Sequence, residues 1–187
     1  MIYDSYAWKR DLLRRKQLII RYNTKEQFEK DEEATFNVIE KAVFYSGFII
    51  RKLIDCKSKL SDEADEYKLT IKKYKPVKEI NKLNRWPEED NYDWGHTNQI
   101  SVNGKDVCNW LIHSYVFFFC FNESGIVVGF FVSSDFDRNK FLYYIRIKDW
   151  IDYMKFIAND SVVSAESIYD EKQHDFIYIR KKRGLIE

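Results

Sequence analysis

The chain has 187 residues, with 31 lysines and arginines against 30 aspartates and glutamates and a formal net charge of +1. This balance excludes a protein whose net charge draws it as a whole to nucleic acid or to a membrane surface. Hydrophobic residues make up 45% of the chain and aromatic residues 17%, which excludes a disordered chain and favours a domain with a substantial sheet. We therefore expect a single globular domain over residues 1–187.

The cysteines indicate a reducing compartment. There are three of them, Cys56, Cys108 and Cys120, and no two have CxxC spacing. With no recognisable signal peptide, this pattern predicts free thiols and a cytoplasmic protein. The most apolar stretch, residues 116–132, is interrupted by Asn122–Gly125, so it predicts a hairpin and not a membrane span.

The first third of the chain predicts helices. Asp4 or Ser5 can cap a helix over residues 5–20, and Thr24 with Gln27 forms a capping box at the start of a long helix over 25–58. Gly47 lies within the apolar stripe of that long helix, which indicates the close approach of another helix. The stripe consists of Phe36, Ile39, Val43, Gly47, Ile50 and Ile54.

The middle of the chain predicts one strand, one loop and one helix. Tyr67, Leu69 and Ile71 alternate with polar residues, which is typical of a strand with one wet face. Residues 77–99 have no clear period and predict an extended loop. A helix should follow over about 105–114, with Val107, Trp110 and Leu111 buried.

The rest of the chain predicts mainly strands. We expect strands over 115–121, 126–132 and 141–147, a short helix over 149–158, and a final hairpin from strands 162–169 and 175–180. Helices followed by strands indicate an α+β fold, in which the N-terminal helices pack on or beside an antiparallel β-meander with a late short helix. The helical part covers about 5–60 and 105–114, and the strand-rich part covers about 115–180.

Residues 108–113, Cys-Asn-Trp-Leu-Ile-His, carry a resemblance to a known family. Over residues 5–115 the chain resembles the HEPN superfamily, helical domains of prokaryotic toxins, antiphage systems and other RNA-cutting proteins. The family signature is an arginine, often followed by an asparagine, with a histidine some five residues after the arginine. Asn109 and His113 stand at matching positions. The resemblance implies a helical bundle, a dimer and metal-independent cleavage of RNA.

Cys108 departs from this signature because it stands where the family has its arginine. Histidine supplies an acid or base near neutral pH, but a thiol cannot supply the fixed cation that stabilises charge on a phosphate. The resemblance therefore implies a non-catalytic binding or assembly protein without a cofactor, acting as a homodimer or with a protein partner, in phage defence or a toxin–antitoxin system. The alternative is a ribonuclease that uses His113 and Asn109 with a cation from Arg51 or from the basic strand that begins at Lys68. A purely structural role for His113 at the end of its helix is a third interpretation.

Three further features are candidates for binding. Lys68, Lys72, Lys73 and Lys75 could contact RNA, although lysines that protect an edge strand would give the same pattern. Asp90, Asp93 and His96 could hold a divalent metal, but a solvated acidic loop is the preferred interpretation, and we predict no metal. An aromatic pocket between the sheet and residues 86–98 would make the protein a small-molecule or nucleotide sensor.

Overall fold

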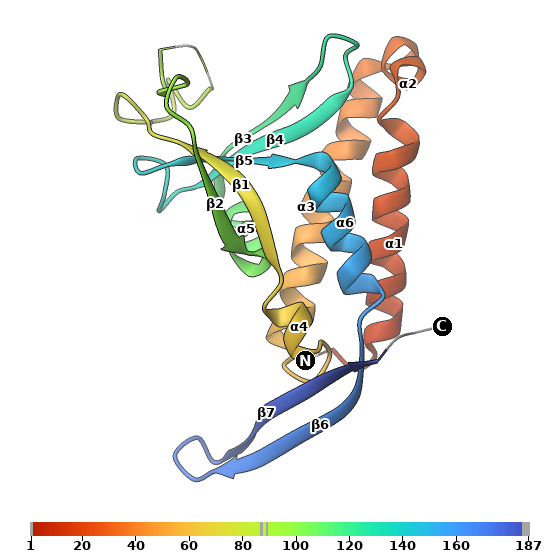
Figure 1. The fold of residues 1–187 in the computed structure, drawn as a ribbon. Coiled ribbons are helices and arrows are strands. Elements are labelled where there is room, and N and C mark those ends of the chain that lie inside the picture. The colour runs from red at the N-terminus through yellow and green to blue at the C-terminus, as the bar shows by residue number, and fades with distance from the viewer. Residues whose placement is uncertain (1, 87, 89, 185–187) are drawn as a thin grey trace.

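A computed structural model describes residues 2–86, 88 and 90–184 and confirms the predicted α+β class (Figure 1). The helices lie on one face of a five-stranded antiparallel sheet, and a separate two-stranded hairpin extends from one end of the molecule. The helices are α1 (Ser5–Tyr22), α2 (Lys25–Lys30), α3 (Glu32–Asp55), α4 (Asp62–Asp65), α5 (Gly104–Ile112) and α6 (Ile147–Ala158). The strands are β1 (Lys68–Tyr74), β2 (Asn98–Asn103), β3 (Ser114–Phe121), β4 (Val127–Ser134), β5 (Leu142–Arg146), β6 (Ser161–Asp170) and β7 (Asp175–Gly184).

The predicted caps are confirmed at the first two helices, but the predicted helix over 25–58 is wrong as a single element. Asp4 accepts a hydrogen bond from the backbone of Tyr6, and Thr24 accepts one from the backbone of Gln27. The backbone N–H of Thr24 donates to the carbonyl of Tyr22 and not to Gln27, so only one half of the predicted capping box forms. Asp31 then adopts extended backbone and separates α2 from α3. Its carboxylate accepts a hydrogen bond from the backbone N–H of Ala34 at 2.9 Å, which caps α3. A side chain that competes for backbone donors thus ends one helix and starts the next.

Close packing between α3 and α5 confirms the interpretation of Gly47. A Cβ atom at this position would lie 3.0 Å from Cδ1 of Leu111 on α5. The α3 helix also accepts a hydrogen bond from α6, because the indole N–H of Trp150 donates to the hydroxyl of Ser46 at 2.9 Å. Both atoms are buried, so this bond satisfies two groups that water cannot reach.

The sheet has the strand order β2-β1-β5-β4-β3, and each pair is antiparallel. Strands β3, β4 and β5 form the predicted meander, but β1 joins it at β5. β1 therefore lies between two strands, and its prediction as a lysine-protected edge strand is wrong. On the helical side, the ring of Phe117 lies 4.6 Å from that of Phe44 on α3, so aromatic packing joins sheet and helix.

Described residues of the segment between β1 and β2, among them Ile80, Tyr92 and Trp94, cover one end of the opposite face of the sheet. A second, smaller apolar cluster forms there from Tyr74, Ile80, Tyr92, Val116 and Leu142. Trp94 packs onto this cluster, with its ring 5.0 Å from Tyr74 and 5.5 Å from Phe131. The extended loop that the sequence predicts is thus fixed to the sheet by its aromatic side chains.

The β6–β7 hairpin lies outside the core. It leaves the lower end of the molecule and projects away from the helices and the sheet (Figure 1). The main core ends at Ala158, and no residue of β6 or β7 belongs to it. In the part of the chain that the structure describes, none of the helices combines the length and the apolar character needed to span a bilayer.

Candidate functional site

Of the three residues predicted for ribonuclease chemistry, Asn109 and His113 line one cavity, and Arg51 lies beside it. Nε of Arg51 on α3 donates to Oδ1 of Asn109 on α5 at 2.8 Å. His113 lies one turn beyond Asn109, and both side chains line a cavity of about 400 Å³. The other lining residues are Asp106, Trp110, Ser134, Asp135, Phe136 and Asp137. Arg51 is thus beside the predicted site, although it is not among the residues that line the cavity.

The charges at this site are unfavourable for a phosphate. The guanidinium of Arg51 forms an ion pair with Asp55, one turn further along α3. The cavity itself carries three carboxylates, Asp106, Asp135 and Asp137, of which Asp135 pairs with Arg138 at 3.0 Å and Asp137 with Lys140 at 3.6 Å. Asp137 accepts a hydrogen bond from the indole N–H of Trp110 at 3.1 Å and so fixes the cavity wall. The residues that line the cavity include no lysine or arginine, and the nearby cations Arg51, Arg138 and Lys140 are already paired with carboxylates, so the site offers a polyanion no unpaired cation.

His113 occupies the helix-end position that its structural interpretation requires. It is the C-cap of α5, and its backbone N–H donates to the carbonyl of Asn109 at 3.0 Å. Its own carbonyl accepts from the backbone N–H of Asp135 at 3.2 Å, which ties the end of α5 to the loop after β4. The imidazole is exposed. The backbone of His113 therefore has a clear structural role, and its ring is free to meet a ligand or a partner.

Cys108 does not lie at this site. Its side chain is buried in the main core, and burial raises the pKa of its thiol. Asn109 and His113 lie on the cavity side of α5, whereas Cys108 lies on the core side with Val107 and Leu111. The position that matches the arginine of the HEPN signature thus faces away from the other two matching positions.

The four predicted nucleic-acid-binding lysines are divided between several environments. Lys68 and Lys72 are exposed on the face of the sheet opposite the helices, and Lys72 lines a small cavity of about 120 Å³ with Arg146. Lys73 points to the other face, where its ammonium lies 4.1 Å from the ring centre of Phe141. Lys75 is exposed beyond the end of β1. Only Lys68 and Lys72 therefore share a surface.

The predicted acidic loop does not gather its ligands. His96 pairs with Asp93, with Nδ1 3.0 Å from the carboxylate, whereas Asp90 pairs with Lys78 at 2.7 Å. Within residues 2–86, 88 and 90–184, no three histidine, cysteine or acidic side chains lie together as a metal site would require. The aromatic side chains Tyr92 and Trp94 pack on the sheet.

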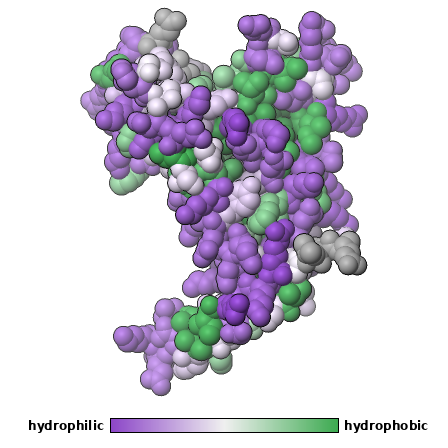
Figure 2. Space-filling model, viewed as in Figure 1, coloured by the Kyte–Doolittle hydropathy of each residue, from purple (hydrophilic) through white to green (hydrophobic). Residues whose placement is uncertain are grey.

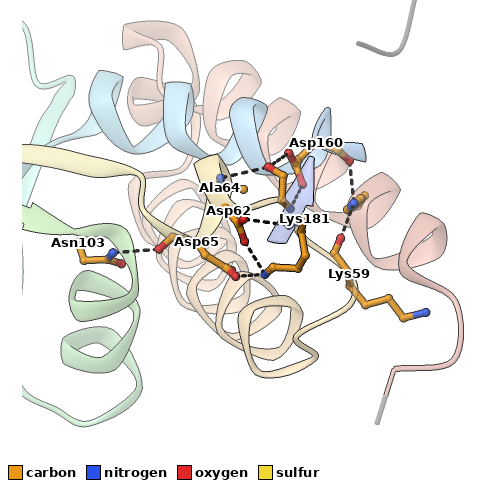
Figure 3. Close-up of polar contacts among 9 residues, drawn as sticks. Lys59, Asp62, Ala64, Asp65, Asn103, Asp160 and Lys181 are labelled. Carbon is orange, nitrogen blue, oxygen red and sulfur yellow. Dashed lines mark hydrogen bonds and ion pairs between the residues drawn. The ribbon is translucent and has the colours of Figure 1, made fainter. Parts of the chain in front are cut away.

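Sequence reasoning missed a buried polar cluster where the hairpin joins the body, which we call the hairpin junction (Figure 3). Lys181 of β7 is buried, and its ammonium pairs with Asp65 and lies 3.7 Å from Asp62. Its backbone N–H donates to the carboxylate of Asp62 at 2.8 Å. Both acids belong to α4, so β7 is held to α4 by charge-assisted hydrogen bonds.

The second half of the hairpin junction surrounds the start of β6. The carboxylate of Asp160 is buried and accepts two hydrogen bonds from Ser61, one from its backbone N–H at 2.8 Å and one from its hydroxyl at 2.6 Å. The ammonium of Lys9 on α1 donates to the carbonyls of Asp160 at 2.7 Å and Lys59 at 3.0 Å. Burial lowers the pKa of Lys9. The base of the hairpin is thus connected to α1, α4 and the loop between α3 and α4.

Beyond this junction the hairpin is exposed. Its side chains include large apolar groups that are exposed, and Figure 2 shows apolar surface on the projecting hairpin. Tyr169 and Phe176 pair across the two strands, with their rings 5.3 Å apart. The exposed apolar residues are Val163, Ile168, Tyr169, Phe176, Tyr178 and Ile179.

Comparisons of the chain with protein-family models, with curated proteins and with solved structures found no match. The functional inference therefore depends on the side chains and surfaces described above.

Proposed function

We propose that this protein is a non-catalytic binding protein whose main binding surface is the β6–β7 hairpin. The observation that carries the proposal is the exposure of Ile168, Tyr169, Phe176, Tyr178 and Ile179 on an element that projects from the body. Exposed apolar groups that cluster on one element mark interaction surfaces, whereas scattered ones do not. The hairpin junction holds this surface in a defined place at the end of the molecule.

The physical chemistry of the hairpin supports a partner. A two-stranded sheet alone is at best marginally stable in water, because it has little apolar surface to bury. Here the hairpin is fixed at its base by ion pairs and hydrogen bonds, while its outer end is stabilised by cross-strand contacts such as that between Tyr169 and Phe176. A partner that covers the aromatic residues would supply the missing burial. Tyrosine and phenylalanine are also among the residues that interfaces favour.

The α5 site supports the same proposal. Cys108 is buried, Arg51 is paired with Asp55, and no lysine or arginine lines the cavity beside His113. These features favour binding over cleavage of RNA. The HEPN-like helical part and a role in phage defence or a toxin–antitoxin system remain part of the proposal, because the resemblance at Asn109 and His113 is what suggests them.

Cross-linking in the native cells tests this proposal. Amine cross-linkers should join Lys172 and Lys182 of the hairpin to another protein chain, and mass spectrometry identifies the linked peptides. Phe176→Ser should reduce these links by about tenfold, the loss expected when an apolar anchor contributing at least 1.4 kcal/mol is removed. Leu83→Ser, which changes an even more exposed apolar residue in the segment between β1 and β2, should leave them unchanged. A hairpin that forms no links to any other chain would refute the proposal.

A second candidate function is a metal-independent ribonuclease, and the Arg51–Asn109 hydrogen bond is the observation that favours it. A conformational change that breaks the Arg51–Asp55 pair would turn the cation toward the cavity. The test is cleavage of single-stranded RNA in EDTA by the wild type, by His113→Ala and by His174→Ala, a control histidine in the hairpin turn. Cleavage lost only in His113→Ala would establish this function, and equal cleavage by both variants would exclude it.

A further inference from the structure

We infer that the partner of the hairpin is a second copy of this chain, which pairs edge to edge through β6 to form a four-stranded antiparallel sheet with the order β7-β6-β6-β7. This inference rests on the proposed function and names its partner. It follows from three observations: which edge of the hairpin is free, what charges that edge carries, and which register a two-fold pairing permits.

The free edge belongs to β6. β7 lies against α4 and is attached to it by Lys181. β6 pairs with β7 on one side, and its residues 163–169 are all exposed. A strand with an unpaired edge presents a row of backbone donors and acceptors, which is a template for another strand.

The composition of β6 suits such pairing, whereas that of β7 does not. Natural proteins protect free edges with lysine, proline or bulges. Between Ser164 and Asp170, β6 has no lysine and no proline, its charges are Glu166 and the terminal Asp170, and the extra residue at the irregularity between Glu166 and Ser167 lies in β7. β7 carries Arg180, Lys181, Lys182 and Arg183 in succession. Two β7 strands would repel each other, so a symmetric pairing has to use β6.

Two-fold symmetry restricts the register of this pairing. Directly opposite residues of an antiparallel pair point to the same face, so a two-fold axis must place one residue opposite its own copy. An axis at Glu166 would bring two Glu166 side chains together, and an axis at Ile168 would place Glu166 opposite Asp170. An axis at Ser167 uses all seven residues from Ser164 to Asp170 and places no like charges directly opposite each other, since the two Glu166 side chains are then diagonal neighbours.

The Ser167 register also makes favourable side-chain pairs. The two Ser167 hydroxyls face each other and can share a hydrogen bond. Tyr169 lies opposite Ala165 of the second copy, on the face that also carries Phe176 and Tyr178, since Phe176 pairs with Tyr169 and Tyr178 pairs with Ser167. The small Ala165 leaves room for the tyrosine ring. The antiparallel arrangement places the two protein bodies at opposite ends of the new sheet.

A charge-swap experiment tests this register. Ser167→Lys alone and Ser167→Asp alone would each place like charges opposite each other on the two-fold axis, and each should raise the dimer dissociation constant by about tenfold or more. An equal mixture of the two variants should form mixed dimers with close to wild-type affinity, because the opposite charges then face each other. Ser124→Lys, on the exposed turn between β3 and β4, is the matched control and should behave as wild type. Sedimentation equilibrium gives the constants, and native mass spectrometry identifies the mixed dimer.

The possible outcomes separate this inference from the proposed function. A monomeric wild type across a wide concentration range would overturn self-pairing, and cross-links from the hairpin to a different protein would still support the proposed function. Both Ser167 variants could leave a dimer intact that Phe176→Ser dissociates. This result would overturn pairing through β6, although the hairpin would still be the binding surface. A hairpin that links to no chain, together with a monomeric wild type, would refute both.

Discussion

Cys108 faces the core of the protein, and this orientation determines what its substitution should do. Its side chain lies among buried groups, whereas Asn109 and His113 line the cavity on the other side of α5. The thiol should therefore resist alkylation in the folded protein, because burial also raises its pKa and the thiolate is the reactive form. Cys108 is thus a core residue.

We predict that Cys108→Arg destabilises the protein and does not create a ribonuclease. An arginine at this position would bury an unpaired charge, which should lower the free energy of unfolding by about 4 kcal/mol or more. Urea denaturation of the variant beside Cys108→Ala measures this loss, since Cys108→Ala removes the thiol without adding charge. A stable Cys108→Arg variant that cleaves RNA in EDTA would show that the side chain reaches the cavity, contrary to this structure.

Asp65 should give the hairpin junction a pH dependence. Burial raises its pKa above 3.8, while Lys181 acts in the opposite direction. A carboxyl with a raised folded-state pKa binds its proton more tightly when folded, so its contribution to stability is greatest below the unfolded pKa and is lost as the pH rises through the folded pKa. The difference in free energy of unfolding between the wild type and Asp65→Asn should therefore fall as the pH rises from 3.8 through the folded-state pKa of Asp65.

Urea denaturation at a series of pH values measures this slope. Asp175→Asn is the control, because Asp175 is exposed at the turn of the same hairpin. A difference between wild type and Asp65→Asn that stays constant with pH, or that rises with it, would mean that the attraction of Lys181 outweighs the burial of Asp65.

The packing of α3 on α5 is an element-scale feature that the sequence does predict. Gly47 interrupts an apolar stripe, and its missing side chain admits Leu111. We predict that Gly47→Leu lowers the free energy of unfolding by about 1–3 kcal/mol, because the added atoms must displace a fully buried leucine. Ala34→Leu, on the exposed first turn of the same helix, should change it little. Thermal unfolding measures both, and equal melting temperatures for the two variants would contradict close packing at Gly47.

Local pattern determined what could be predicted at this scale. Alternation identified β1, the helical period identified α1 and α5, and Asn122–Gly125 identified the β3–β4 turn, because each signal lies within a few neighbouring residues. The break at Asp31 was missed, since an aspartate within a polar stretch is equally compatible with a continuous helix. The place of β1 between β2 and β5 could not be predicted, because it depends on pairing with Tyr143 and Tyr144, about seventy residues away along the chain.

The hairpin junction was missed for a related reason. Lys9 does carry a local signal, because it lies three residues before the buried Leu12 and so shares its face of α1. Lys181 carries none, because it is one of four consecutive basic residues, Arg180 to Arg183, and only the fold distinguishes it from the other three. The partners of these two lysines come from α4 and from the start of β6. A cluster assembled from such distant segments has no sequence motif.

At the scale of the whole molecule, the body and the hairpin differ in how they are stabilised. The body has an apolar core that extends from Ile2 to Ala158, and the hairpin depends on polar contacts at its base and on its own strand pairing. A structure of this kind should lose its hairpin without losing its fold. The binding surface would then be separable from the part that carries it, as the proposed function requires.

We predict that a chain ending at Asp160 still folds. It keeps the whole core and the hydrogen bonds between Asp160 and Ser61, and it loses Lys181 and Arg183. Asp62 and Asp65 are only partly buried, so water can replace their partner. The melting temperature should fall by about 2–8 °C, which corresponds to roughly 1–2 kcal/mol in a chain of this size. The emission of the buried Trp150 should remain that of a ring shielded from water. A truncated chain that no longer unfolds cooperatively would show instead that the hairpin is required for the fold, and its exposed apolar residues could then not be assigned to binding alone.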